Sequence, residues 1–346
     1  MMRPLVWCLL SAALFGVSTP ASKHLLGTMS PLLLSGLLYV GAAVAVMPGA
    51  VRERARLTTA DRKNWLCLLG AVLFGGVIGP VLLLFGLSLA PAGSVALWLN
   101  LETVSTAFIA RIFFAEHLHG RTWIAVGLIL AGSAILSPGS GAGLDAVLLV
   151  SLAAVAWGLD NNLTSVIDRF TPAQVTFAKG IAAGLINGSL GLLLSDGRPE
   201  AASIGLALVI GAASYGVSIL LYIRGAQHLG ATRSQLVFST APAWGLVVAW
   251  VVLREPMTRM QWLAAALMAI AIWLWNRERH GHEHEHVPTT HTHWHRHDDD
   301  HHEHAHPDAA PSTWHSHAHT HDAVRHSHEH QPDLHHRHEH DEERPS

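Results

Sequence analysis

The chain has 346 residues, and its charge and histidine content differ sharply between two regions. Residues 1–279 contain 4 of the 27 histidines and carry a net charge of +7, whereas residues 280–346 contain the other 23 and carry −10. The overall net charge of −3 at pH 7 therefore describes neither region. Cys8 and Cys67, the only two cysteines, lie in apolar runs, which argues against a disulfide framework and a cysteine-based zinc site.

Ten apolar runs, most of them as long as a membrane-spanning helix, follow one another through the first region. A hydrocarbon core about 30 Å thick needs roughly 20 residues of helix to cross it. The runs cover residues 4–26, 31–50, 65–89, 91–114, 121–138, 144–166, 172–195, 202–226, 231–253 and 259–276. The amphipathic helices that a soluble α-helical protein presents to water are almost absent. We therefore predict an all-α integral membrane protein of about ten transmembrane helices.

Positive charge is concentrated in the joints on one side of this predicted membrane domain. Arg52, Arg54, Arg56, Arg62 and Lys63 follow the second run, whereas the joints after the first, third and fifth runs contain no Lys or Arg. Cytoplasmic joints carry the excess of positive charge. We therefore predict a multi-pass protein of the inner (plasma) membrane with both termini in the cytoplasm. The first run resembles a secretory signal, but it continues past residue 20, so we expect it to be retained as a helix.

The two halves of the apolar region come into register when the sequence is shifted by 139 residues. Glu116 then falls on Glu255 and Trp123 on Trp262, and the apolar runs that follow match in length. Each half holds five runs, and an odd number of spans inserts the second copy upside down. The sequence therefore predicts two inverted five-helix repeats. They cover residues 1–138 and 139–279, and the tail covers residues 280–346.

This ordered set of residues resembles the ten-helix EamA branch of the drug/metabolite transporter superfamily, over roughly residues 4–276. The matching features are Phe15-Gly16, Pro20 and Lys23 in the first run, Glu116 and Glu255 after the fourth run of each half, and Trp123 and Trp262 opening the next. The departures are Asn162 and Ser165 near the positions equivalent to Pro20 and Lys23, and Thr103 where the ninth run has Pro242. The resemblance implies a secondary transporter of small metabolites that hydrolyses no nucleotide and is not an enzyme. The chain has no GxxxxGK[ST] loop, which agrees.

Glu102 is a carboxylate in the middle of the fourth run. A charged residue at that depth costs about 2.5–3.5 kcal/mol on insertion scales, so it needs a reason. On a continuous helix Trp98, Ser105 and Thr106 would share one face with it, which makes a polar, aromatic stripe. A carboxylate in a partly dry cavity can exchange protons near neutral pH. We interpret Glu102 as a proton-coupling or cation-binding group, the alternative being a structural glutamate hydrogen-bonded to a neighbouring helix.

Other polar residues in the runs are weaker candidates for a substrate pocket. Asp160, Asn161 and Thr164 form a cluster in the sixth run, and Lys179 in the seventh lies at a comparable depth. If Lys179 pairs with Asp160, both residues become structural or gating groups. Lys23 lies near the outer end of the first run, where it either contributes to transport or extends to the interface at little cost.

The eighth run carries a continuous face of small and aromatic residues. Gly211, Tyr215, Ser218, Tyr222 and Gly225 recur at spacings of three and four. Small residues allow close helix packing. Because tyrosine is poorly suited to a tight helix contact, we favour the interpretation that Tyr215, Ser218 and Tyr222 line a cavity for an amphipathic substrate.

The tail replaces hydrophobic periodicity with alternating histidines and acidic residues. Such a segment has almost no apolar surface to bury, so we predict that it is disordered. Neutral imidazoles interleaved with carboxylates suit Zn, Ni, Co or Cu ions. The alternative is a polar, pH-buffering appendage. The predicted metal ligands are His282, His284, His286, His291, His293, His295, His297, His315, His317, His319, His321, His326, His328, His330, His335, His336, His338 and His340.

Three functional hypotheses follow from these features. The first is secondary active export of a small metabolite around Glu102, with a metal-binding cytoplasmic tail. The second is efflux or homeostasis of a divalent metal ion (Zn, Ni or Co) or its chelate, and the third is a non-transporting membrane metal sensor. The apolar region is short of His, Cys and carboxylate clusters, which favours the first. We expect no required cofactor. The expected partners are the lipid bilayer, a small-molecule substrate and metal ions, with no nucleic acid.

Overall fold

The computed structural model describes residues 2–52, 61–114, 120–135, 143–167, 169–195, 199–229, 237–276, 280–285, 289–295, 315–321 and 325–330. The described helices belong to one compact unit, and the described strands belong to a second unit, Arg279–Gln331. Each unit is described separately below.

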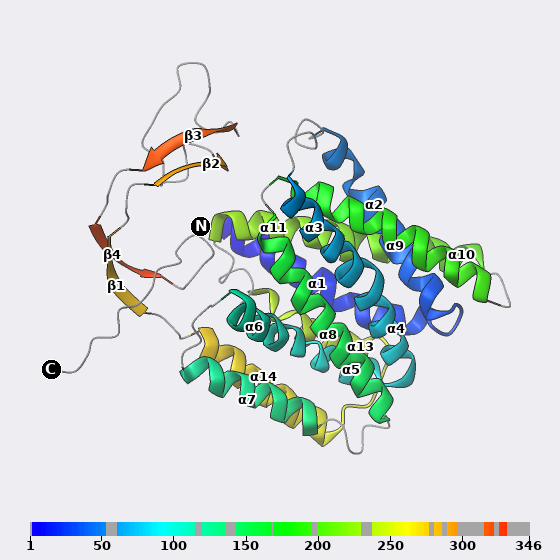
Figure 1. The fold of residues 1–346 in the computed structure, drawn as a ribbon. Helices are drawn as coiled ribbons and strands as arrows, with labels where there is room; N and C mark the ends of the chain where they lie inside the picture. Colours follow the sequence, from blue (N-terminus) through cyan, green and yellow to red (C-terminus); the bar gives the residue numbers. More distant parts are fainter. Residues whose placement is uncertain are drawn as a thin grey trace. The chain divides into compact units, whose positions relative to one another are not determined.

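The helices of the first unit follow the predicted apolar runs (Figure 1). In the first half they are α1 Met2–Leu25, α2 Pro31–Arg52, α3 Arg62–Gly70 with η2 Ala71–Ile78 and α4 Gly79–Leu89, α5 Ala92–Trp98, α6 Leu101–Phe114 and α7 Gly120–Ile135. In the second half they are α8 Leu144–Ser165, α9 Pro172–Leu194, α10 Ala201–Ile210 with η3 Gly211–Val217 and α11 Ser218–Leu229, α13 Ala241–Val251 and α14 Arg259–Asn276.

The helical unit has the surface of a membrane protein. Within the described residues, seven helical segments are long and apolar enough to cross a membrane. Three shorter apolar helices, Trp123–Gly132, Ala241–Val251 and Arg259–Ala271, occupy the positions of the fifth, ninth and tenth runs. Large apolar side chains point outward, including Phe113 at 74% exposure and Leu193 at 80%. Such a surface is stable in lipid and not in water, so the predicted all-α membrane fold of about ten helices is confirmed.

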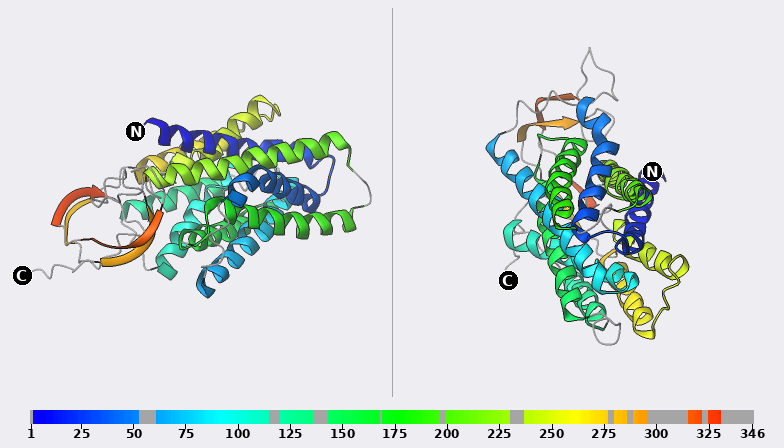
Figure 2. Two further views of the ribbon diagram at one scale, coloured as in Figure 1. Left: turned by 90° about the horizontal axis from the view of Figure 1, so that it is seen from above. Right: turned by 90° about the vertical axis from the view of Figure 1, so that its right-hand side faces the viewer.

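Helix packing follows the inverted repeat (Figures 1 and 2). α2 packs against its equivalent α9, and α7 packs against its equivalent α14. α1 packs against α11 and α13, and its equivalent α8 packs in the same way against α4 and α6. The two halves therefore form one interlocked bundle, in which these helices of the two repeats have equivalent neighbours.

Two pairs of helix interruptions also obey the repeat. The π-helical segments η2 and η3 occupy equivalent places in the third and eighth runs. In a π-helix the carbonyl of one residue accepts a hydrogen bond from the N–H of the fifth residue after it. For the Gly75 carbonyl in η2 that residue is Pro80, which has no N–H. Tyr39 Oη and Trp157 Nε1 donate to this carbonyl instead, at 2.6 and 3.1 Å. The irregular backbone is therefore satisfied by neighbouring helices.

The second pair of interruptions changes the interpretation of the fourth run. We predicted one helix over residues 91–114, but the helix stops after Trp98 and restarts at Leu101. Asn100 accounts for the break, because its Nδ2 donates to the Leu97 carbonyl at 3.3 Å and competes with the helical bonds of the backbone. The equivalent break in the ninth run lies at Ser239 and Thr240, just before α13.

Glycines allow the two halves to approach closely at α1 and α13. A Cβ atom added at Gly16 would lie 2.2 Å from the Ala241 carbonyl oxygen and 2.9 Å from Trp244 Cβ. Gly245 faces the same contact, where an added Cβ would lie 2.8 Å from the Gly16 carbonyl oxygen. The start of α13 thus rests directly on the backbone of α1.

Replacing Gly16 with alanine should force α1 and α13 apart. We expect an apparent loss of about 1–3 kcal/mol in stability, because the added methyl group meets backbone and cannot be relieved by a side-chain rotation. Thermal unfolding of the purified protein in detergent measures this loss. The matched control is Gly205→Ala in α10, where an added Cβ meets nothing within 4 Å. Equal melting temperatures for the two variants would contradict the contact.

The described residues of the second unit form four strands in two antiparallel pairs. They are β1 His280–Glu285 with β4 Arg325–His330, and β2 Thr289–His295 with β3 His315–His321. We predicted disorder for this part of the chain, so that prediction is not confirmed. Each sheet has only two strands, and two-stranded sheets are marginally stable in water.

Candidate functional site

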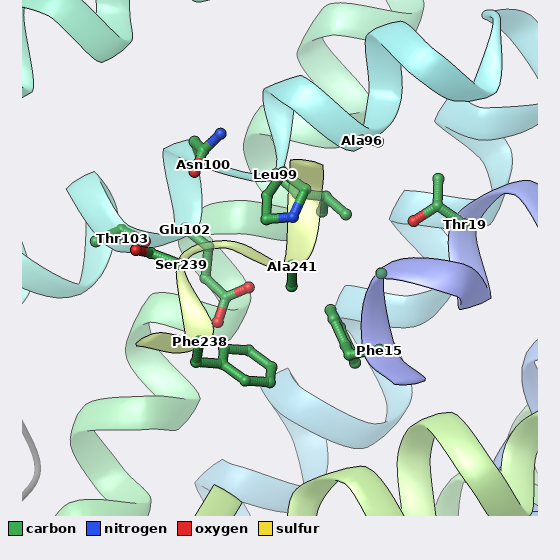
Figure 3. A pocket seen from close by; sticks show the side chains of 12 residues that line it. Phe15, Thr19, Ala96, Leu99, Asn100, Glu102, Thr103, Phe238, Ser239 and Ala241 are labelled. Carbon is green, nitrogen blue, oxygen red and sulfur yellow. The ribbon is translucent and has the colours of Figure 1, made fainter. Parts of the chain in front are cut away.

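A cavity lies where both helix breaks meet α1 (Figure 3). The space between its walls, including the part that is open to the outside, is about 400 Å³. The lining residues are Phe15, Gly16 and Thr19 of α1, Ala96, Leu99, Asn100, Glu102 and Thr103 around the first break, and Phe238, Ser239, Ala241 and Pro242 around the second. Leu99 and Asn100 lie 139 residues before Phe238 and Ser239. The cavity is therefore bounded by equivalent parts of the two repeats.

Glu102 is held at the edge of this cavity by α8. Asn161 Nδ2 donates to Glu102 Oε1 at 2.8 Å and to Thr106 Oγ1 at 3.2 Å. Thr106 Oγ1 in turn donates to the Glu102 carbonyl at 2.8 Å. Within the described part of the chain no group donates to Glu102 Oε2, and the carboxylate points into the cavity (Figure 3). The arrangement fixes one oxygen and leaves the other for a proton or a substrate.

Asp160 and Lys179 form the ion pair that the sequence suggested. Lys179 Nζ donates to both carboxylate oxygens of Asp160, at 2.6 and 2.7 Å, and each side chain is 11% exposed. Thr164 Oγ1 donates to the same carboxylate at 3.0 Å. Gly75 makes room for the pair, because an added Cβ there would lie 2.0 Å from the Asp160 carboxylate. The pair connects α8, α9 and η2, and its members do not line the cavity.

An aromatic cluster forms one side of the cavity. The Phe15 ring lies 5.4 Å from Phe238, 5.7 Å from Tyr215 and 6.0 Å from Trp157, measured between ring centroids. Phe238 also lies 5.0 Å from Tyr222. The rings of Phe15 and Phe238 border the cavity (Figure 3). Tyr215 and Tyr222 contact these two rings but are not among the residues that line the cavity.

The residues predicted on the eighth run, Tyr215, Ser218 and Tyr222, are not among the residues that line this cavity. The π-helical segment η3 interrupts the α-helical spacing on which the predicted face depended. Ser218 instead forms two hydrogen bonds with Ser11. The Ser218 hydroxyl donates to the Ser11 carbonyl at 2.9 Å, and the Ser11 hydroxyl donates to the Ser218 carbonyl at 2.7 Å. Gly211 packs on α2, where an added Cβ would overlap the Leu38 carbonyl. Ser218 thus contacts α1, and Gly211 contacts α2.

The predicted stripe on the fourth run is also interrupted. Because the helix breaks between Trp98 and Glu102, these residues do not share a continuous helical face. Trp98 is fully buried in the core. Ser105 packs against α8, where its Cβ would lie 2.9 Å from a Cβ added at Gly158. Neither Trp98 nor Ser105 lines the cavity.

Lys23 and Glu255 both cap helix ends. Lys23 Nζ donates to the carbonyls of Leu87, Ser88 and Ala90, at 2.7, 3.3 and 2.9 Å, and so caps the end of α4. The Glu255 carboxylate accepts the backbone N–H groups at the start of α5, at 3.0 Å each. Lys23 is thus engaged by backbone, and the predicted counterpart of Glu255, Glu116, lies outside the described residues.

Several cavity residues did not stand out in the sequence. Thr19, Asn100, Thr103, Phe238 and Ser239 all line the cavity, and none was predicted to do so. The repeat could have indicated Asn100, Phe238 and Ser239. The shift of 139 residues places Asn100 on Ser239 and Leu99 on Phe238, and Pro242 lies a few residues further along. Short polar residues and proline at equivalent mid-membrane positions mark broken helices.

The predicted metal ligands lie in the tail. His282, His284, His326, His328 and His330 fall on β1 and β4, and His291, His293, His295, His315, His317, His319 and His321 fall on β2 and β3. His286, His297, His335, His336, His338 and His340 lie outside the described residues. Among the side chains that the structure describes, no three His, Cys, Asp or Glu residues lie close enough to hold a metal ion.

Comparisons with known proteins agree with this architecture. An uncharacterized transporter of Methanothermobacter thermautotrophicus is 24% identical over 277 residues, which cover 73% of this chain and 80% of the relative. A solved crystal structure shares the fold with a TM-score of 0.59 and 15% identity, covering 78% of this chain and 94% of the other. The EamA-like transporter family matches residues 2–137 and again residues 144–277. The two matches coincide with the two repeats of the bundle, and the chain therefore belongs to the EamA-like transporter family.

Proposed function

We propose that the protein is a proton-coupled secondary active exporter of a small metabolite, with Glu102 as the coupling group. The observation that carries this proposal is a carboxylate in a cavity between two symmetry-related helix breaks, with one oxygen to which no described residue donates. Broken helices at the midplane of an inverted repeat are typical of substrate sites in secondary transporters. No nucleotide is consumed, because the proton gradient supplies the free energy.

The repeat supports an alternating-access mechanism. α1 and α13 bound one side of the cavity, and their equivalents α8 and α6 hold Glu102 on the other. Rocking of one group against the other would expose the cavity to each side of the membrane in turn. Glu102 would accept a proton in the outward-facing state and exchange it for substrate in the inward-facing state. Because proton and substrate bind to Glu102 in turn, proton influx and substrate efflux would be obligatorily coupled.

Inside-out membrane vesicles containing the full chain test the proposal. Respiration acidifies the vesicle interior, and a pH-sensitive dye reports the gradient. A panel of small cations, zwitterions and anions is then added to the outside, which corresponds to the cytoplasm. We expect at least one compound to dissipate the gradient in these vesicles and not in vesicles that lack the protein. A panel without any such compound would refute proton-coupled export.

The orientation of the chain is a further part of the proposal. Both termini lie in the cytoplasm if the joints rich in Lys and Arg do. A reporter fused after Arg279 should therefore be active in the cytoplasm, and a reporter placed in the joint 137–144 should be active outside. A reporter after Arg279 that is active only outside would overturn both the orientation and the count of ten spans.

We also propose that the tail binds transition-metal ions such as Zn²⁺ or Ni²⁺. The strand register supports this, because it places histidine opposite histidine at six positions. The pairs are His280 with His330, His282 with His328, His284 with His326, His291 with His319, His293 with His317 and His295 with His315. Directly opposite residues in an antiparallel pair lie close together, and imidazole is a favoured ligand of these ions.

Metal binding by the tail should disappear as the pH falls. The full chain should bind more than one Zn²⁺ or Ni²⁺ ion at pH 7.5 beyond what a chain truncated after Arg279 binds. It should release these ions toward pH 5.5, because imidazole has an ordinary pKa of about 6.5 and binds metal only when neutral. Calorimetry on both chains measures the difference. No difference at pH 7.5, or binding unchanged at pH 5.5, would reduce the tail to a polar appendage.

The tail also favours a second candidate function, efflux of a divalent metal ion or its chelate. Metal-sensitivity of a deletion strain complemented with the full chain or with residues 1–279 separates the candidates. Restored resistance that needs both the tail and Glu102 would favour metal export. Resistance independent of Glu102 would favour a sensor that does not transport.

A further inference from the structure

We infer that the substrate of the cavity is a small organic cation with an apolar body, such as an amine or a quaternary ammonium compound. The inference rests on the proposed function and narrows it. Glu102 is the only charged side chain among the described residues that line the cavity. The other lining groups are aromatic, aliphatic or neutral hydrogen-bonding side chains. A ligand that neutralises this carboxylate must carry positive charge.

The surroundings do not cancel the charge of Glu102. The charged groups that interact with it from the neighbouring helices are Asp160 of α8 and Lys179 of α9. These two neutralise each other through their ion pair. The remaining titratable neighbours, Tyr39, Tyr215 and Tyr222, are phenols that are uncharged at neutral pH. The net charge presented to the cavity is therefore that of one carboxylate.

An anionic or zwitterionic substrate would find no cationic side chain for its negative group among the described residues that line the cavity. Lys179 is held by Asp160 and Thr164, and Lys23 is held by three carbonyls. The half-helices α6 and α13 begin at the cavity, but the N–H groups of Glu102, Thr103 and Ala243 already donate to backbone carbonyls. Pro242 has no N–H to offer. These N–H groups are therefore not free to bind a carboxylate.

The aromatic wall completes a site for a cation with an apolar body. Phe15 and Phe238 border the cavity on the side toward which the Glu102 carboxylate points (Figure 3). Their ring centroids lie 5.4 Å apart and the ring planes are tilted by 45°, so the two rings form one apolar wall. A ring face attracts a cation that lies within about 6 Å of its centroid. Glu102 would bind the charged head while the two rings contact its substituents.

Calorimetry on the purified full chain with three matched aromatic probes tests the inference. Benzyltrimethylammonium carries a permanent positive charge, phenylacetate a negative charge, and phenylalanine both. We expect only benzyltrimethylammonium to bind at pH 7.5. Its affinity should fall as the pH is lowered to 5.5, because a proton then competes for Glu102. Glu102→Gln should weaken the binding of benzyltrimethylammonium at least about tenfold, because it removes a charge-assisted contact.

Further variants test the contribution of the aromatic rings and include a control for the loss of a carboxylate elsewhere in the protein. Phe15→Leu and Phe238→Leu should each weaken the binding of benzyltrimethylammonium by about 2- to 30-fold. Asp145→Asn, which removes an exposed carboxylate at the start of α8, should leave it unchanged. Binding of phenylacetate or phenylalanine, or no binding of benzyltrimethylammonium to the folded wild-type chain, would overturn the inference. Proton-coupled export would survive that result, because it fails only if no compound dissipates the vesicle gradient.

Discussion

Replacing Glu102 with glutamine should abolish proton-coupled transport while the protein still inserts and folds. Glutamine keeps the shape of the side chain and can still accept the hydrogen bond from Asn161 Nδ2. It cannot bind or release a proton, so neither half of the exchange can occur. In inside-out vesicles, the compounds that dissipate the pH gradient with wild-type protein should have no effect with the variant. We expect the rate of gradient dissipation to fall at least about 100-fold, which corresponds to an increase of about 2.7 kcal/mol or more in activation free energy.

The matched control for this experiment is Asp145→Asn. It removes one carboxylate from an exposed position in the first turn of α8, far along the helix from Asn161. Its transport should equal that of the wild type. Size-exclusion chromatography of both variants shows whether they fold. Full activity of Glu102→Gln with an unchanged pH dependence would make Glu102 a structural residue and refute the proposed coupling.

The fold was largely predictable because length and apolarity decide which segments cross a membrane. A run of about 20 apolar residues can satisfy its backbone only as a helix in lipid. The inverted repeat was equally visible, since Glu116 and Trp123 recur as Glu255 and Trp262 at a constant offset. Helix interruptions were not predicted. Hydropathy is insensitive to Asn100 or Pro80 inside an apolar run, although each removes or redirects a backbone hydrogen bond.

The site was predicted only in part, for the same reason. Glu102, Asn161, Asp160 and Lys179 were conspicuous because polar groups in a membrane need partners, and the structure pairs them. The spacing argument for Trp98 assumed an unbroken helix and therefore failed. The phenylalanines and short polar residues of the cavity resemble ordinary packing residues in the sequence. Only the meeting of the two breaks with α1 gives them a common site.

Removing one partner of the Asp160–Lys179 pair should strongly destabilise the helical unit. Asp160→Asn leaves the Lys179 ammonium group in a site that is 11% exposed, and Lys179→Gln leaves the Asp160 carboxylate uncompensated. A buried charge that loses its partner costs about 3–5 kcal/mol. We expect each single variant to lower the melting temperature in detergent by far more than Asp145→Asn does. The double variant, Asp160→Asn with Lys179→Gln, should recover most of the loss, because it buries no charge.

The double variant also decides what the pair does. Lys179 donates to both oxygens of Asp160, Thr164 donates to one of them, and none of the three lines the cavity. We therefore expect the pair to hold α8 against α9 and η2, and so to position Asn161, which in turn holds Glu102. A structural pair predicts that the double variant keeps its proton-coupled transport in vesicles. Stability restored without transport would instead identify the pair as a gate, and equal, additive losses from the two single variants would show that the charges are not coupled at all.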